Sequence, residues 1–458
     1  MAAGPVPGPS PSLSAPLAPS PSPSPSLTTA SCRTSTASPA STASPASTAS
    51  PARPGPARCR PRPLPTHPPL PPALLTLLAV LLTALNLRLG ISSASALLDA
   101  LRGSLGLSPP VVALLPTLPT LCFAAAGAGT GTLARRLGAE RTVLLATAAL
   151  TAGLAVRAVP ATWALLAGTV LGMSGLALCN VLLPTLVRSH FPDRIGPLTG
   201  LYTTVLALGA ALASAAAVPV ADAVGSPSLG LAVWAAPALV AAAVWAGIRA
   251  PREGPRRAAG HGPARQPSAP VSPWAMARTR TGALVTAYFG LQALNAYAVV
   301  GWLPSLLSGQ GMSEGRAGAV LAVTQAVGIP VSFAVLALAK EPGRLRGAFV
   351  AVSLAMLAGF GGLLVAPVAL PWVWAVLTGL GMCSFPLVLA VIARSGGSPA
   401  ETTALSTLAQ SLGYLVAALG PLAVGLLHGA TGGWTAPMAL LLATAAAQLA
   451  VGVALSRR

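Results

Sequence analysis

The apolar and polar positions of the chain alternate on the length scale of membrane-spanning helices. From about residue 73 to the C-terminus, apolar runs of about 17–25 residues are separated by short polar segments. A helix rises about 1.5 Å per residue, so such a run can cross a hydrocarbon core roughly 30 Å thick. The pattern predicts an all-α membrane protein with about twelve transmembrane helices. The expected spans are residues 73–95, 109–133, 142–158, 162–187, 196–220, 229–249, 281–305, 316–338, 347–366, 371–393, 402–427 and 434–455.

The composition agrees with this pattern, because 54% of the 458 residues are hydrophobic and 8% are charged, which excludes a soluble globular protein. The net charge of +19 does not indicate a nucleic-acid partner, because the basic residues lie in alternate loops. Loops on one side hold Arg135, Arg136, Arg141, Arg188, Arg194, Arg249, Arg252, Arg256, Arg257, Arg265, Arg278, Arg280, Lys340, Arg344, Arg346, Arg394, Arg457 and Arg458, and loops on the other hold Arg102, Arg157 and Arg316. This asymmetry predicts that both termini lie in the cytosol, on the inner face of the plasma membrane.

The sequence predicts four regions. Residues 1–71 are rich in Pro, Ser, Ala and Thr, which favours a disordered cytosolic tail; a mis-assigned gene start is the alternative. Residues 72–249 and 281–458 are each expected to form a six-helix half, joined by a basic cytosolic linker at 250–280. The tripeptide ALN at 84–86 recurs at 293–295. Two parallel six-helix repeats are the arrangement of the major facilitator fold, whose site lies between the halves near mid-membrane.

Four segments resemble one branch of the major facilitator superfamily, the cyanate and nitroimidazole permease group. They are NLRLGISSASALLDALRGSLGLS (86–108), NVLLPTLVRSHFPDRIGPLTGLYTT (180–204), YFGLQALNAYAVVGWLPSLL (288–307) and LSTLAQSLGYLVAALGPLAVGLLHGATGGW (405–434). The resemblance implies a carrier for a small anion or nitroimidazole-like solute, with Arg88 as an anion ligand. The group usually has proline directly after NLR, where this chain has Leu89 and Gly90.

The segment GTLARRLGAER (131–141) resembles the facilitator loop between the second and third helices, which latches the halves on the cytosolic side. The resemblance implies a cytosolic gate made by Gly131, Arg136, Gly138, Glu140 and Arg141. The family's acidic position is Arg135 here, and Glu140 offers a carboxylate in a different place. A generic turn carrying inside-positive charge is an equal alternative.

Arg88 is a charged residue within an apolar run. The nearest acidic residue in the sequence is Asp99, beyond the end of that run. A helix that begins near Ala73 has climbed roughly 22 Å by Arg88, which is still within lipid. An unpaired charge there costs at least about 2.5–3.5 kcal/mol, so we expect Arg88 to face a wet cavity or an anionic or polar solute. The alternative is that Arg88 snorkels to the interface or binds backbone carbonyls.

Other polar residues within the spans are candidates for solute contacts, because amides and phenols can donate hydrogen bonds without adding charge. They are Asn86, Asn180, Tyr202, Gln292, Asn295, Tyr297, Gln325, Gln410 and Tyr414. Gln292 and Asn295 are three residues apart on one helix face, and Tyr297 mirrors Arg88 in the second half, so these three are favoured. We expect substrate binding by Arg88, Asn86, Gln292, Asn295, Tyr297, Asn180, Gln410 and Tyr414. The alternative is interhelical hydrogen bonding, worth about 0.6 kcal/mol on average.

The absence of other chemistry narrows the function. All eight acidic residues fall in loops or at helix ends, and no GxxxxGK[ST] loop or CxxC pair is present. We therefore expect no enzyme activity, catalytic residue, metal or cofactor. The predicted function is secondary active or facilitative transport of a small anionic or polar organic solute, by a monomer in the lipid bilayer. The alternatives are an efflux carrier for a small drug-like compound and a non-transporting receptor or scaffold.

Overall fold

The computed structural model describes residues 72–248, 272–338, 342–396 and 398–457, and every regular element within them is helical. The first helices are α1 (Pro72–Ala96), α2 (Leu98–Leu105), α3 (Pro109–Leu114), α4 (Leu118–Leu137), α5 (Ala139–Val156), α6 (Thr162–His190), the 3₁₀ helix η1 (Pro192–Arg194), α7 (Ile195–Ala223), α8 (Pro227–Val233) and α9 (Ala235–Gly247). After the linker come α10 (Pro273–Ala277), α11 (Arg280–Ser308), α12 (Glu314–Ala326), α13 (Gly328–Leu338), α14 (Pro342–Val365), α15 (Pro371–Met382), α16 (Ser384–Ser395), α17 (Pro399–Thr431) and α18 (Thr435–Ser456).

The helices follow the expected spans closely. Among the described residues, eleven helical segments are long and apolar enough to cross a membrane. The sequence predicts twelve spans, and the one without a matching segment is 109–133. A turn at 115–117 divides this span into α3 and α4. Glycines, threonines and two arginines make α4 less apolar than the other long helices. The predicted tail (1–71) lies outside the described residues, as does most of the predicted linker (250–280), whose end contains α10.

Besides 109–133, three further expected spans consist of two helices, and in these three each break falls three residues before a proline. The breaks are at Trp234, Val327 and Cys383, ahead of Pro237, Pro330 and Pro386. Proline lacks the N–H that would bond the carbonyl four residues earlier, and its ring crowds that carbonyl. Four other prolines, Pro184, Pro219, Pro304 and Pro421, lie inside continuous helices. Helix α1 has no break at Leu89 and Gly90.

Small residues bring the helices of each half into close contact. Gly153 of α5 lies against the backbone of Gly172 on α6, and Gly209 of α7 lies against the carbonyl of Leu85 on α1. Gly420 of α17 packs in the same way on the carbonyl of Leu294 in α11. A side chain at any of these glycines would overlap the neighbouring helix. Packing of this kind replaces the hydrophobic driving force that helices lack within lipid.

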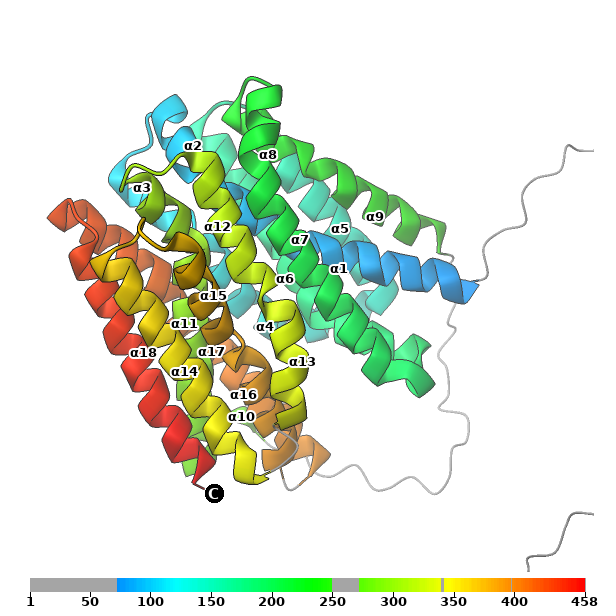
Figure 1. Ribbon diagram of the computed structural model, residues 1–458. Coiled ribbons are helices and arrows are strands. Elements are labelled where there is room, and N and C mark those ends of the chain that lie inside the picture. Colours follow the sequence, from blue (N-terminus) through cyan, green and yellow to red (C-terminus); the bar gives the residue numbers. More distant parts are fainter. Residues whose placement is uncertain (1–71, 249–271, 339–341, 397, 458) are drawn as a thin grey trace, which may run out of the picture. The chain divides into compact units, whose positions relative to one another are not determined.

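Polar contacts join the first half (α1–α9) to the second half (α11–α18). Gln325 of α12 accepts a hydrogen bond from Ser92 of α1 at 3.1 Å and donates to Ser214 of α7 at 2.6 Å. Ser305 of α11 donates to the carboxylate of Asp99 on α2 at 3.1 Å. Figure 1 shows α2, α3, α8 and α12 at one end of the helical unit. We call this end the α2 end, and these contacts close the two halves there.

The close approach of α7 and α12 gives a first prediction. A Cβ added at Gly318 would lie 2.5 Å from the carbonyl oxygen of Ser214. We expect Gly318→Ala to force the halves apart and to lower stability by about 1–3 kcal/mol. The measurement is the apparent Tm of the purified protein.

Gly315→Ala, one helical turn earlier on α12, is the matched control. No atom lies within 4 Å of its added Cβ, and alanine favours the helix by up to about 1 kcal/mol. Equal melting temperatures for the two variants would contradict the tight contact at Gly318.

Candidate functional site

Arg88 reaches from α1 toward the second half of the protein. Its side chain is half-buried, and its Nη1 donates a hydrogen bond to the Tyr297 hydroxyl of α11 at 3.3 Å. Its Cζ also lies 5.3 Å from the centroid of the Tyr297 ring, a cation–π distance. No described carboxylate lies within 4 Å of this guanidinium. Arg88 therefore points between the halves and does not snorkel to the membrane interface.

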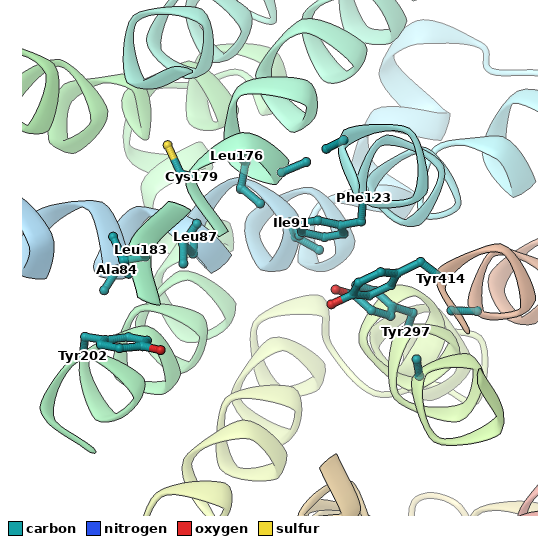
Figure 2. Close-up of a cluster of buried hydrophobic side chains, with 14 of the residues drawn as sticks. Ala84, Leu87, Ile91, Phe123, Leu176, Cys179, Leu183, Tyr202, Tyr297 and Tyr414 are labelled. Atoms are coloured by element: carbon teal, nitrogen blue, oxygen red, sulfur yellow. The ribbon is translucent and has the colours of Figure 1, made fainter. Parts of the chain in front are cut away.

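Three aromatic rings from three helices gather around this contact. The centroids of Phe123 (α4) and Tyr414 (α17) are 5.2 Å apart, and that of Tyr297 is 6.2 Å from Phe123 and 6.3 Å from Tyr414. Figure 2 shows the hydroxyl oxygens of Tyr297 and Tyr414 side by side on the face toward α1. The ring of Phe289 on α11 packs edge-to-face against the ring of Tyr414, with centroids 5.4 Å apart. The rings form a rigid aromatic wall beside the charge.

Two amide side chains lie near this wall. Asn180 on α6 is half-buried and interacts with the Tyr414 hydroxyl. Gln410 is half-buried one helical turn before Tyr414, where its amide donates to Ser406 on the same helix at 2.8 Å. We use the name central site for the five residues Arg88, Phe123, Asn180, Tyr297 and Tyr414.

The side chains of the central site have the chemistry that an anion or a polar solute would need. It contains one fixed cation, two phenol hydroxyls and one amide, and no member carries negative charge. Hydrogen bonds from a charged donor are about twice as strong as those between neutral groups. The aromatic faces can stack on a planar solute. The arrangement provides no nucleophile paired with a base, and the described residues contain no cluster of potential metal ligands.

Three of the expected site amides lie elsewhere. The Asn86 amide donates to the carbonyls of Leu82 at 2.8 Å and Pro237 at 3.1 Å, which ties α1 to α9. Asn295 is fully buried and bonds Gln448 at 3.0 Å and Thr444 at 2.7 Å, both on α18. These two amides make the interhelical pairings that the sequence offered as the alternative to solute contact.

Gln292 is buried, and its Oε1 has no hydrogen-bond partner among the described residues. Helical spacing places it on the same face of α11 as Tyr288 and Asn295, four residues after the first and three before the second. Both of those residues interact with Gln448 of α18. Gln292 therefore faces the interior of the second half, away from the side of α11 that carries Tyr297.

The predicted gate segment joins α4 and α5. Gly138 adopts φ +85°, a conformation that glycine favours, and ends α4. Glu140 makes a hydrogen bond with His190 of α6, with Oε1 and Nε2 2.9 Å apart. Gly131, Arg136 and Arg141 are exposed. This hydrogen bond lies within the first half and connects α5 to α6, and the latching role of this segment stays a prediction.

Sequence reasoning missed Phe123, which completes the aromatic wall. The sequence did contain a signal for this residue, because Phe123 is the sole aromatic residue in the predicted span 109–133. It also missed the roles of Asp99 and Ser305, which meet across the halves at the α2 end. Neither residue stands out by sequence, since serine is common in this chain and Asp99 lies beyond a span.

Comparisons with known proteins show the family of the chain. Residues 76–421 match the family model described as the Major Facilitator Superfamily. The chain belongs to this superfamily. It is therefore a transporter of small solutes and a multi-pass protein of the plasma membrane. The family and the relatives below are transporters, which points to a protein without enzyme activity.

Three relatives of this facilitator cover most of its length. An uncharacterized transporter, YycB, of Bacillus subtilis (strain 168) is 34% identical over 80% of this chain and 89% of its own. The 2-nitroimidazole transporter of Escherichia coli (strain K12) is 33% identical over 78% and 89%. The cyanate transport protein CynX of the same strain is 28% identical over 78% and 91%.

Solved structures show the same fold. A bacterial homologue of the human lysosomal transporter Spinster aligns with a TM-score of 0.70. The alignment covers 85% of this facilitator and 98% of that chain at 16% sequence identity. The shared arrangement of helices is thus that of a major facilitator transporter.

The buried network around Asn295 in this facilitator gives a second prediction. Replacing Asn295 by leucine removes the donor to the Gln448 Oε1 and one acceptor of the Thr444 hydroxyl, so we expect a loss of about 1–3 kcal/mol of stability. The measurement is the apparent Tm without any solute. Gln410→Leu is the control, because Gln410 bonds only within its own helix and is half-buried. An Asn295 variant as stable as the control would contradict the network.

Asp99 gives a third prediction, on pH. Burial raises the pKa of Asp99 above its ordinary 3.8, against opposing effects from the Ser305 hydrogen bond, Arg102 and His428. The folded, closed protein therefore binds a proton more tightly than a state that exposes Asp99. Stability and closure at the α2 end should fall as the pH rises from 3.8 through the raised pKa.

The measurement is apparent Tm against pH for the wild type and for Asp99→Asn. The amide cannot ionise, so the variant should lose this decline with rising pH. Identical pH profiles would contradict the assignment.

Proposed function

We propose that this facilitator is a secondary carrier for small anionic or polar organic solutes, and that nitroimidazole-like compounds and cyanate-like anions define its substrate class. The observation that carries the proposal is the contact of Arg88 with Tyr297, because it places between the two halves a cation that no described carboxylate pairs with. The names of two relatives, a 2-nitroimidazole transporter and a cyanate transport protein, support the same class.

The central site explains how such solutes would be held. The Arg88 guanidinium would bind a negative charge or the oxygens of a nitro group, and the hydroxyls of Tyr297 and Tyr414 would add hydrogen bonds. The ring of Phe123, which stacks with that of Tyr414, would lie against a planar solute. Asn86 and Asn295 are left out of this proposal because each is already paired within its own half.

The contacts between the halves support transport by alternating access. Arg88 and Tyr297 belong to different halves, as do Gln325 and Ser214, and Asp99 and Ser305. Each pair is a neutral or singly charged hydrogen bond worth about 0.5–3 kcal/mol. Such contacts can break and reform as the halves rock.

The experiment is uptake of radiolabelled 2-nitroimidazole and cyanate into liposomes that contain the purified protein. Losing a hydrogen bond to a charged group costs about 1.5–3 kcal/mol, so Arg88→Gln should weaken solute affinity roughly 10- to 150-fold. Arg88→Lys keeps the charge and loses the forked geometry, so a smaller loss is expected.

Arg102→Gln is the control, because Arg102 is exposed on α2 and lies outside the central site. Unchanged affinity in both Arg88 variants would remove Arg88 from the site. Failure of the wild type to move either solute would overturn the proposed substrate class.

A further inference from the structure

A second arginine, Arg157, is buried inside the first half. The sequence assigned it to a polar loop, but its side chain is 1% exposed and sits at the end of α5. Its Nη1 donates to the carbonyl oxygen of Gly90 on α1 at 3.1 Å. Its Nε is buried without a hydrogen-bond partner in the part of the chain that the structure describes. The guanidinium thus has unused donor capacity.

The charge of Arg157 is not compensated by the protein around it. No described Asp or Glu lies within 4 Å of its nitrogens. Removing an ion from water costs several kcal/mol, and proteins offset this cost by pairing the ion with an opposite charge. The Gly90 carbonyl supplies a dipole and no countercharge. A mobile anion would supply the negative charge that the neighbouring described side chains lack.

A cavity of about 20 Å³ has Arg157 in its wall, together with residues that include Gly90, Ser95, Pro116, Thr169 and Met173. This volume holds one water-sized particle. The hydroxyls of Ser95 and Thr169 donate to carbonyls of their own helices, those of Ile91 and Leu165. Arg157 is therefore the charged residue of this wall, and the rest of the wall is mostly apolar.

We propose that this cavity is a second anion site, which binds one small, weakly hydrated monovalent anion of the halide type through the Arg157 guanidinium. A monovalent anion would balance the single positive charge of Arg157. The cavity is too small for an organic anion, and its apolar wall disfavours strongly hydrated anions such as sulfate.

The second anion site is separate from the central site. Arg88 and Gly90 are two residues apart on α1, so their directions differ by about 200° around the helix axis. Arg88 faces α11 of the second half, whereas the Gly90 carbonyl meets Arg157 at the end of α5. The two sites share α1 and lie on opposite sides of it.

The anion would also support the surface on which the halves close. Pro116 lines the cavity, and the same residue packs against Gly301 of α11, where an added Cβ would lie 2.8 Å from Pro116 Cβ. An occupied cavity would fix the turn between α3 and α4 from the inside. Its occupancy would therefore stabilise the folded protein.

The first experiment measures the apparent Tm of the full-length purified protein while sodium chloride replaces sodium gluconate at constant ionic strength. A ligand that binds only the folded state raises stability with its concentration, so we expect a saturable rise of about 2 °C or more. Arg157→Gln should abolish this rise. Arg88→Gln, which alters only the central site, should retain it.

The second experiment needs no variant and therefore holds if Arg157→Gln does not fold. A crystal of the wild type grown in sodium bromide should show an anomalous peak within about 3.5 Å of a guanidinium nitrogen of Arg157. A water molecule only at that position, without an anomalous peak, would overturn the proposal. A chloride response that is lost in Arg88→Gln and kept in Arg157→Gln would overturn it as well, by assigning the anion to the central site.

Discussion

The site depends on one constraint, an arginine that has no acidic partner in the described part of the chain and is held between two bundles of apolar helices. The chain gives Arg88 a phenol oxygen and an aromatic face from the opposite half. Both are weaker partners than a carboxylate. They stabilise the cation and leave it able to attract a ligand. A carboxylate at the same place would have neutralised the site.

The remaining polar side chains of the interior divide between packing and recognition. Asn86 and Asn295 occupy corresponding places in the repeated ALN tripeptide. Each side-chain amide donates a hydrogen bond to another helix of its own half. Arg88 and Tyr297 follow them by two residues on each helix. That offset turns their side chains about 200° around the axis, toward the other half. In each half, the asparagine of the tripeptide therefore bonds within its own half, and the residue two positions later contacts the other half.

Hydropathy predicted nearly all of the fold, because spans of this length leave the chain few alternatives in lipid. The breaks at Trp234, Val327 and Cys383 follow from the prolines three residues later, although Pro184 and Pro421 lie inside unbroken helices. Proline position alone therefore does not decide a break, since neighbouring helices can accommodate it.

The central site was predictable in part. Arg88, Asn180, Tyr297 and Tyr414 stood out as polar residues within apolar runs, but the contact between Arg88 and Tyr297 depends on how the halves meet. Gln292 and Asn295 were favoured for their shared helix face, and that face turns toward α18. The burial of Arg157 had no signal in the sequence, because a residue at the end of a span is exposed or buried according to its neighbours.

The missing carboxylate beside Arg88 has an electrical consequence. In the proposed cycle, an anionic solute cancels the charge of the guanidinium, so the loaded centre is neutral and the empty centre is positive. Moving one elementary charge through 100 mV changes the energy by about 2.3 kcal/mol. The voltage across the cell membrane, negative inside, therefore acts on the unloaded carrier and draws its centre toward the cytosol. In the proposed transport cycle, the reorientation of the unloaded carrier is therefore the step whose rate depends on the membrane potential.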